Sequence, residues 1–349
     1  MLKKTITFII VILISFLLID TTPTGVLPNS NSKAIANVAV LLYNFSDSFT
    51  LRLKNSFEAI EKENKDKVHF TFYDGINNIH NQVLAIDSLP NTDFIIATLA
   101  ETDEHSVTEI VERVKQKNIP LILFEVNPEI ATKISKIYNK VVFASINAEQ
   151  SGINEANIII DLWNTNKNLI DKNHDDTIQY IMLTGQVNNV VSMERSKHSI
   201  QTINKAGIKT EEIAKVTANW SKEIAKEAID NLFLRYGGKI EAIISNNDPM
   251  AIGAIEILQK YGYNKGDKSK YIAVVGVDGI QEAKTLIDQG FMLGTIIQDT
   301  KDIAEILYTL GINLTNNLSP VANTPYSFKN GVVIFTLPYD KYVNKPNFS

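Results

Sequence analysis

The segment from Asp171 to Gln179, DKNHDDTIQ, places oxygen-bearing side chains at every second position. Asp171, Asn173 and Asp175 are followed in the same register by Thr177 and Gln179. A Ca2+ ion takes about six to eight oxygen ligands, and a tight loop can direct alternate residues at one point. The spacing is therefore that of a calcium-binding loop.

The residues alone also allow a second interpretation of this segment. The helix-loop-helix type of calcium loop has Gly at its sixth position and a bidentate Glu at its twelfth. This chain has Asp176 and Met182 at those positions. The segment is thus either a metal loop of another kind or a solvated polar turn, which is the commoner use of such residues.

The composition is that of a soluble globular protein. The chain has 349 residues, of which 44% are apolar and 21% charged, and this length is enough for two domains. A net charge of -5 without a long basic run argues against nucleic acid as a partner. The absence of cysteine excludes disulfides, thiolate metal sites, a cysteine nucleophile and a lipid-bearing cysteine anchor.

The first residues differ from the rest of the chain. Lys3 and Lys4 precede the apolar run ITFIIVILISFLLI, an order typical of an export signal. A helix over residues 5–19 would be about 22 Å long, short of the ~30 Å hydrocarbon core, so a cleaved signal and a retained membrane anchor both stay open. We therefore expect residues 1–35 to be a signal or anchor segment with a linker, and the rest to be extracytoplasmic, either periplasmic or at the cell surface.

Short apolar runs alternate with longer stretches of helical periodicity. The first series is VAVLLY, VHFTFY, DFIIATL and PLILFEV, and the second is VVFASI, IQYIMLT, EAIISN, YIAVVGVD and FMLGTII. This alternation predicts βαβ units and hence an α/β fold of two doubly wound lobes with parallel sheets. Ligands of such sheets bind beyond the carboxyl ends of the strands, where this chain has Asp47, Asn247, Asp278 and Gln298.

Motifs of the common catalytic classes are missing from the sequence. The two Gly-rich phosphate loops, G-x-G-x-x-G and G-x-x-x-x-G-K-[ST], do not follow any expected strand, and no G-x-S-x-G motif occurs. The histidines do not have the spacing of metal ligands. Carboxylates at strand ends have no accompanying nucleophile or metal cage. We therefore expect a binding protein, and an enzyme is the least favoured alternative.

Several segments resemble the periplasmic galactose/glucose-binding protein, one of the type I sugar-binding proteins that share their fold with lac-repressor-like regulators. The resemblance covers the chain after about residue 36. It rests on YNFSDSF (43–49), the DKNHDDTIQ loop, MERS (193–196), TANW (217–220), IEAIISNNDPMAIGAIEIL (240–258), VVGVDG (274–279) and LGTIIQD (293–299).

The resemblance implies two lobes joined by a three-strand hinge that close on a monosaccharide. The expected hinge segments are residues 144–147, 296–299 and 329–332. The expected N-terminal lobe is residues 36–145 plus 299–330, and the expected C-terminal lobe is residues 146–298 plus 331–349.

The resemblance also implies a structural Ca2+ ion in the loop, because the family binds calcium there. The implied ligands are the side chains of Asp171, Asn173, Asp175 and Gln179, the carbonyl of Thr177, and Glu241 from the separate segment KIEAII. Asp176 stands where the family usually has Gly, and Asp enters the left-handed region more readily than most residues.

Sugar recognition needs flat aromatic faces and planar polar groups that take paired hydroxyls. Phe49, placed by the pattern in a loop, and Trp220 match the stacking positions of the family. The matching hydrogen-bonding positions are Asp47, Arg195, Asn247 and Asp278. Asn189 and Gln298 are also expected at the site, although their residue types differ from those of the family.

Each of these residues also has a structural interpretation. The aromatic residues could pack in the core, and Arg195 could be a surface charge. Asp47 and Asp278 could cap helices, as we expect of Asp248 before Pro249. The joint match of the positions favours a binding site.

The chain departs from the family at several polar contacts. Asn189 and Val191 align with a His and an Asp, and Ala100 and Gln298 align with asparagines. Losing one hydrogen-bonding group costs ~1–3 kcal/mol where the ligand hydroxyl remains. We expect a changed sugar preference or a looser site, unless groups such as Glu101 or Asn188 compensate.

The expected partners follow from the resemblance and from the absence of cysteine. The closed receptor would deliver sugar to a membrane permease of the ATP-binding-cassette class, or it would stay membrane-tethered and signal to a sensor histidine kinase. The missing lipid-acceptor cysteine favours a tethered protein. A repressor is excluded because the chain starts with an apolar segment and no helix-turn-helix, and a protein-interaction module that has lost sugar binding is the alternative.

Overall fold

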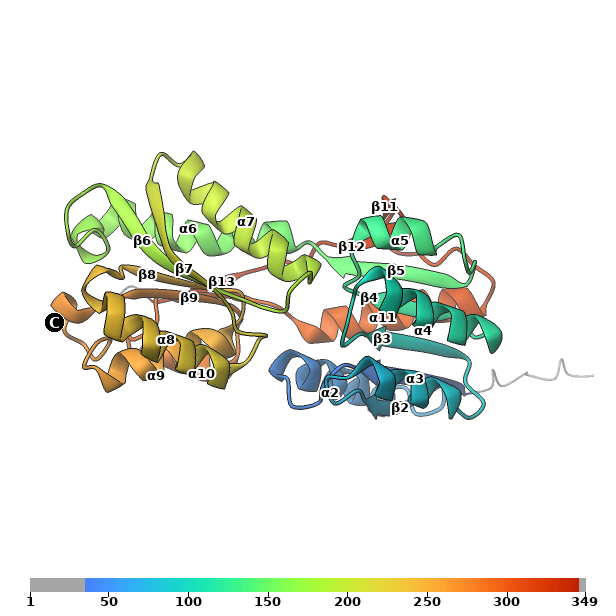
Figure 1. Ribbon diagram of the computed structural model, residues 1–349. Helices are drawn as coiled ribbons and strands as arrows, with labels where there is room; N and C mark the ends of the chain where they lie inside the picture. Colours follow the sequence, from blue (N-terminus) through green and yellow to red (C-terminus); the bar gives the residue numbers. More distant parts are fainter. Residues whose placement is uncertain (1–34, 345–349) are drawn as a thin grey trace, which may run out of the picture. The chain divides into compact units, whose positions relative to one another are not determined.

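The computed structural model describes residues 35–344, and a compact unit begins at Ala36. The expected export segment lies almost wholly outside the described residues. None of the helices within residues 35–344 combines the length and the apolar character of a membrane span. The strands of this part form two sheets, each covered by helices on both faces (Figure 1).

The first sheet has seven strands in the order β11-β12-β5-β4-β3-β1-β2. Its strands are β1 (Ala36–Leu42), β2 (Val68–Asp74), β3 (Phe94–Thr98), β4 (Leu121–Phe124), β5 (Val141–Ile146), β11 (Phe328–Lys329) and β12 (Val332–Phe335). All neighbours are parallel except β11 and β12. Strands β3 and β4 are buried along their whole length, which explains their unbroken apolar sequences.

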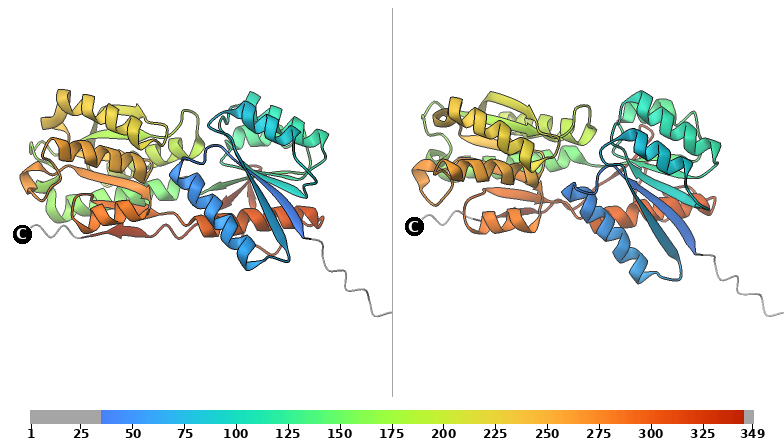
Figure 2. Two further views of the ribbon diagram at one scale, coloured as in Figure 1. Left: turned by 90° about the horizontal axis from the view of Figure 1, so that it is seen from below. Right: turned by 60° about the horizontal axis from the view of Figure 1, so that its bottom comes forward.

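Helices from distant parts of the chain cover this sheet. They are α2 (Ser48–Glu63), α3 (Ile79–Asp87), α4 (Glu104–Gln116), α5 (Pro128–Ile134) and α11 (Thr300–Thr315). Helices α2 and α11 share one buried cluster through Leu53 and Leu307, and α4 belongs to a separate cluster through Val107 and Val111. Helices α2 and α11 lie on one face of the sheet and α4 lies on the other (Figure 2).

The second sheet has six strands in the order β13-β10-β9-β8-β6-β7. They are β6 (Thr177–Thr184), β7 (Lys209–Thr217), β8 (Ala242–Ser245), β9 (Ala273–Asp278), β10 (Gly294–Ile297) and the antiparallel β13 (Lys341–Val343). Its helices are α6 (Ala148–Asn166), α7 (Val190–Lys205), α8 (Lys222–Tyr236), α9 (Asp248–Lys260) and α10 (Gln281–Asp288). Five strands of each sheet follow the doubly wound order 2-1-3-4-5, which confirms the predicted fold class.

The chain passes between the lobes at Asn147, at residues 298–299 and at residues 336–340. The first two crossings lie at the expected segments. The third differs from the expected residues 329–332, because β12 pairs in parallel with β5 in the first sheet. Residues 332–335 thus belong to the first lobe and not to the second.

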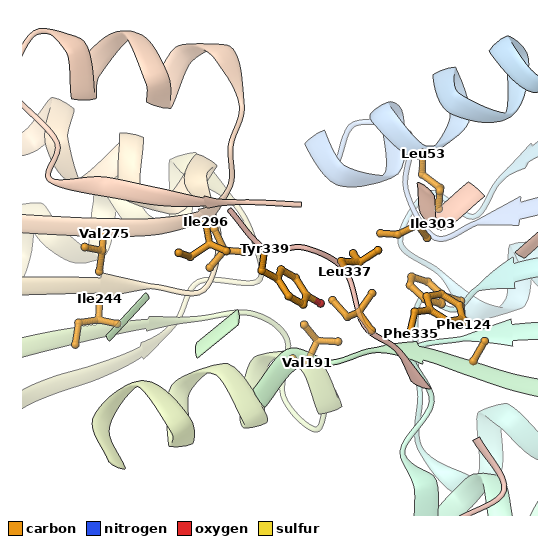
Figure 3. Close-up of a cluster of buried hydrophobic side chains, with 14 of the residues drawn as sticks. Leu53, Phe124, Val191, Ile244, Val275, Ile296, Ile303, Phe335, Leu337 and Tyr339 are labelled. Carbon is orange, nitrogen blue, oxygen red and sulfur yellow. The ribbon is translucent and has the colours of Figure 1, made fainter. Parts of the chain in front are cut away.

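The third crossing is packed and not free in solvent. Leu337 and Tyr339 are buried within the apolar cluster that also contains Phe335 and Ile296 (Figure 3). The Nδ2 group of Asn154 donates a hydrogen bond to the carbonyl of Tyr339 at 3.0 Å. The crossing is therefore held by both lobes.

The carboxyl group of Glu155 is enclosed between helices α6 and α7, on one face of the second sheet. Glu155 of α6 has no exposed surface, and Ser199 of α7 donates to its Oε2 atom at 2.7 Å. The other carboxyl oxygen, Oε1, has no hydrogen-bond partner among the described residues. Burial raises the pKa of Glu155 to about 8, against the lowering effects of the Ser199 hydrogen bond and the Arg195 charge.

The Glu155→Gln substitution should stabilise the protein increasingly as pH rises. An unfolded Glu ionises above about pH 4.3, whereas folded Glu155 keeps its proton to about pH 8. Its contribution to stability is therefore complete below about pH 4 and is lost as pH rises towards 8. Urea unfolding from pH 5 to 7.5 should shift the stability difference towards the variant by about 1.4 kcal/mol per pH unit.

The matched control is Glu112→Gln on an exposed position of α4, whose stability difference should not change with pH. A pH-independent difference for Glu155→Gln would contradict the assignment of a buried, protonated Glu155.

Candidate functional site

Residues at the carboxyl ends of strands from both sheets line one cavity of about 550 Å3, a volume that includes space open to solvent. All residues expected at the ligand site lie on its wall, namely Asp47, Phe49, Asn189, Arg195, Trp220, Asn247, Asp278 and Gln298. Sequence reasoning missed further lining residues, namely Tyr43, Thr98, Leu99, Thr102, Phe124, Glu125 and Gln186, and knew Val191 only as a departure. The parallel strands bring these separate segments together at one edge.

Aromatic side chains reach the cavity from both lobes. Phe49 lies in the first turn of α2, not in a loop as expected, and its ring stacks on Phe124 with a centroid distance of 6.5 Å and an interplanar angle of 20°. Trp220 has a left-handed backbone with φ of 64°. A Cβ atom at position 185 would lie 2.1 Å from the Trp220 ring, so only Gly185 leaves room for the indole.

Three polar lining residues both cap helices and face the cavity. Asp47, Asn189 and Asn247 precede α2, α7 and α9, and each side chain accepts a hydrogen bond from a backbone N–H in the first turn, at 2.8, 3.0 and 3.0 Å respectively. Capping and cavity lining were alternatives for Asp47, and the structure shows both. The caps fix these side chains at the cavity edge.

Asp278, the last residue of β9, does not cap the following helix. Helix α10 has Ile280 at its N-cap without a side-chain hydrogen bond, and the Ile280 N–H donates to Asp248 Oδ2 at 2.9 Å. The Oδ1 atom of Asp278 lies 3.6 Å from an Arg52 nitrogen of the first lobe. Its Oδ2 atom is buried and has no hydrogen-bond partner among residues 35–344.

The expected capping role of Asp248 is wrong, because Asn247 is the N-cap of α9. Asp248 is instead fully buried and accepts a hydrogen bond from the Thr295 hydroxyl at 2.6 Å. Burial and the neighbouring Asp278 charge raise the pKa of Asp248 to about 7.

Arg195 is a buried residue of α7 with 3% exposure, so its interpretation as a surface charge is wrong. Its guanidinium donates to the Ser151 hydroxyl at 3.0 Å, to the Asn246 carbonyl at 2.7 Å and to the Gln298 Oε1 atom. A buried cation requires such acceptors. Arg195 thus holds Gln298, at the second crossing, against the second lobe.

Glu125 directly follows β4 and was not identified from the sequence. Its backbone is left-handed, with φ of 67°, an uncommon conformation for a residue other than glycine. Removal from water raises the pKa of its carboxyl to about 7, against the lowering effect of the Arg195 charge and with further raising effects from Asp47 and Asp278. A strained backbone at a lined cavity is a feature often found in ligand sites.

The proposed compensating residues, Glu101 and Asn188, lie beside the cavity and not in it. Together with Ala100 they line a neighbouring pocket that shares Thr102 and Gln186 with the cavity. Thr98, at the end of β3, lines the cavity itself. The polar group that this strand offers to the cavity is therefore a hydroxyl two residues before Ala100.

The suspected calcium loop lies at the amino ends of β6 and β8, whereas the cavity lies at carboxyl ends. The side chains of Asn173, Asp175 and Gln179 contact one another at 2.8–3.2 Å. The Asp175 N–H donates to Asp171 Oδ1 at 3.1 Å. The structure therefore brings these suspected side-chain ligands into one network.

Glu241 lies against the same loop, with 3% exposure. It accepts backbone hydrogen bonds from Lys172 at 2.6 Å and from Gln179 at 3.2 Å. Thr177 donates its N–H to Asp175 Oδ1 at 2.9 Å. No cluster of three or more His, Asp or Glu side chains placed to hold a metal occurs in the described residues, so any cation here would also need the amide oxygens.

The cavity combines aromatic faces with carboxylate and amide groups held in fixed orientations. Aromatic faces pack against C–H groups, and planar acceptors bind hydroxyl groups in pairs. Sites of this kind suit a small polar ring.

Comparisons with known proteins agree with this geometry. The D-galactose/methyl-galactoside binding periplasmic protein MglB of Haemophilus influenzae is 28% identical over 305 residues, covering 86% of this chain and 88% of that protein. The D-allose-binding periplasmic protein of Escherichia coli is 23% identical, covering 80% of this chain and 84% of that protein. These relatives are named as binding proteins and not as enzymes, in agreement with the expectation from the sequence.

A solved structure shows the same fold. It is the ABC transporter solute binding protein from Bacillus halodurans with bound myo-inositol, which superposes with a TM-score of 0.69 at 21% identity and covers 89% of this chain and 95% of that one. The family described as the periplasmic binding protein domain matches residues 38–318. The matched family implies an extracytoplasmic location. With its two parallel-sheet lobes, the chain belongs to the type I periplasmic binding proteins of the sugar-binding family.

Proposed function

We propose that this protein is a receptor for a monosaccharide of the galactose or glucose type, bound in the cavity between the carboxyl ends of the two sheets. The observation that carries the proposal is the placement of Phe49 and Trp220, one from each lobe, on the wall of a cavity that also presents Asp47, Asn247 and Asp278. The names of the relatives support a sugar as ligand.

Contacts between the lobes support closure as the response to ligand. Arg52 of the first lobe donates to the carbonyl of Asp278 at 3.1 Å, and Gln186 of the second lobe donates to Asn77 Oδ1 at 3.3 Å. Both contacts join the two lobes beside the cavity. The closed arrangement that encloses a ligand would therefore also contain these two hydrogen bonds.

The proposal is tested by calorimetric titration of the full-length protein with D-glucose, D-galactose, D-xylose, L-arabinose and D-ribose. Micromolar binding of at least one sugar is expected. Absence of binding to all of them would favour a protein-interaction module that has lost sugar binding, because Val191 and Gln298 replace polar groups of the family.

Two partners are consistent with such a receptor. The similarity to proteins named as ABC transporter solute binding proteins supports a membrane permease. The alternative, a membrane sensor kinase reached by a tethered receptor, rests on the apolar run at residues 5–19 and on the lack of cysteine. Intact-mass measurement on membrane and soluble fractions separates a tethered protein from a cleaved one.

The Trp220→Ala substitution should weaken binding of the best sugar by about tenfold or more, because buried aromatic anchors commonly contribute more than 1.4 kcal/mol to binding. Leu234→Ala, at an exposed position of α8, is the control and should leave the affinity unchanged. Equal affinities of the wild type and Trp220→Ala would place the sugar elsewhere.

We further propose that the loop of residues 171–179 binds a structural Ca2+ ion. The buried carboxylates of Asp171 and Glu241 and the contacts among Asn173, Asp175 and Gln179 fit an oxygen-ligated cation. The Lys167 ammonium lies 3.2 Å from Asp171 Oδ2 and would compete with the ion at that carboxylate. The ion would tie the start of β6 to the start of β8 and would take no part in ligand binding.

Calcium should raise the thermal stability of the wild type relative to chelator. An ion present at 100 times its Kd stabilises the folded state by about 2.7 kcal/mol. Glu241→Gln should lose this shift, whereas Asp176→Asn should keep it because Asp176 is not among the proposed ligands. Equal melting temperatures of the wild type in calcium and in chelator would rule out the site.

A further inference from the structure

We propose that the preferred ligand of the cavity carries a protonated amine that pairs with the Glu125 carboxylate, so that the receptor selects amino sugars or other amine-bearing polyhydroxylated rings. The inference rests on the proposed function, because it names the class of ring bound at that same site.

The Glu125 carboxylate lacks a partner on the protein. Neither a hydrogen bond nor an ion pair joins it to another residue of the described chain, and only its backbone N–H is engaged, by the Ala144 carbonyl at 2.8 Å. The side chain faces the cavity and is half-buried. A carboxylate in this position becomes costly once lobe closure removes its water, unless the ligand supplies a donor.

The negative charges of the other two carboxylates of the wall each face a positive group of the protein. Asp47 accepts the N–H of Thr50 at 2.8 Å, at the positive end of α2. Asp278 lies 3.6 Å from the Arg52 guanidinium. Glu125 is therefore the carboxylate whose charge the ligand must balance.

Arg195, the one cation among the described residues that line the cavity, is already engaged. Each nitrogen of the Arg195 guanidinium donates to an acceptor of the second lobe, and Arg195 forms no ion pair with Glu125. Asp47 and Asp278 add negative charge near Glu125, as their raising effects on its pKa show. The electrostatic balance of the cavity thus favours a cationic ligand.

A second observation also indicates a donor-rich ligand. Asp278 lines the cavity, and its Oδ2 atom is buried without a hydrogen-bond partner within residues 35–344. An ammonium group carries three donors, which is more than a hydroxyl can offer. The stacked rings of Phe49 and Phe124 beside Glu125 provide aromatic faces that attract a cation further.

A neutral sugar is the competing ligand, because Glu125 can also take up a proton. The groups that interact with its carboxyl are Asp47, Asp278, Arg195, Tyr43 and Tyr339. With a neutral ring, Glu125 keeps the proton and forms an ordinary hydrogen bond. With an ammonium, it releases the proton and forms a charge-assisted bond, which is about twice as strong.

The test is calorimetric titration of the full-length protein at pH 7 with paired ligands. D-Glucose and D-galactose are compared with 2-amino-2-deoxy-D-glucose, 2-amino-2-deoxy-D-galactose and 3-amino-3-deoxy-D-glucose. The proteins are the wild type, Glu125→Gln and the control Glu129→Gln, which alters an exposed carboxylate in α5.

At least one amino sugar should bind the wild type and the control about tenfold tighter than its hydroxyl parent, and Glu125→Gln should abolish this preference. Parent sugars that bind as tightly as every amino sugar, or a preference unchanged in Glu125→Gln, would overturn the inference while leaving the proposed function intact. Absence of binding by both classes would overturn both.

Discussion

The buried guanidinium of Arg195 is the interaction on which the geometry of the site depends. It joins Ser151 after the first crossing, the Asn246 carbonyl after β8 and Gln298 at the second crossing. Because a buried cation is costly without acceptors, the folded second lobe requires these three segments to be positioned around the guanidinium. The same bonds hold α6, α7 and the end of β10 around one end of the cavity, so that folding and site formation share one constraint.

The cavity exists because parallel strands direct their carboxyl ends to one edge of each sheet. Three of its polar residues obtain fixed orientations from helix caps, which are local interactions within a few residues. Others depend on strained backbone, since Glu125, Trp220 and Asp278 all have positive φ angles. Such conformations cost about 1–3 kcal/mol each and persist only where the surrounding structure enforces them. The surrounding fold therefore positions these binding groups, against the backbone conformations that such residues usually adopt.

The sequence predicts the fold and half of the residues of the cavity wall, because apolar strands and the polar residues that follow them are local patterns. It does not predict the sheet to which the run at residues 332–335 belongs, since an apolar run carries no information about its partner. Glu125 is missed because its importance arises from a left-handed turn and from distant neighbours. Thr98 is missed because the resemblance draws attention to Ala100, and a family resemblance cannot show which residue near the end of a strand faces the cavity.

A crystal structure of the full-length protein grown with saturating D-galactose would show whether one small polar ring binds between the carboxyl ends of the two sheets. Electron density for the sugar is expected between Phe49 and Trp220, within hydrogen-bond distance of Asp47, Asn247 or Asp278. Density for the sugar only in the neighbouring pocket beside Ala100 and Asn188, or an empty cavity at saturation, would contradict this binding mode.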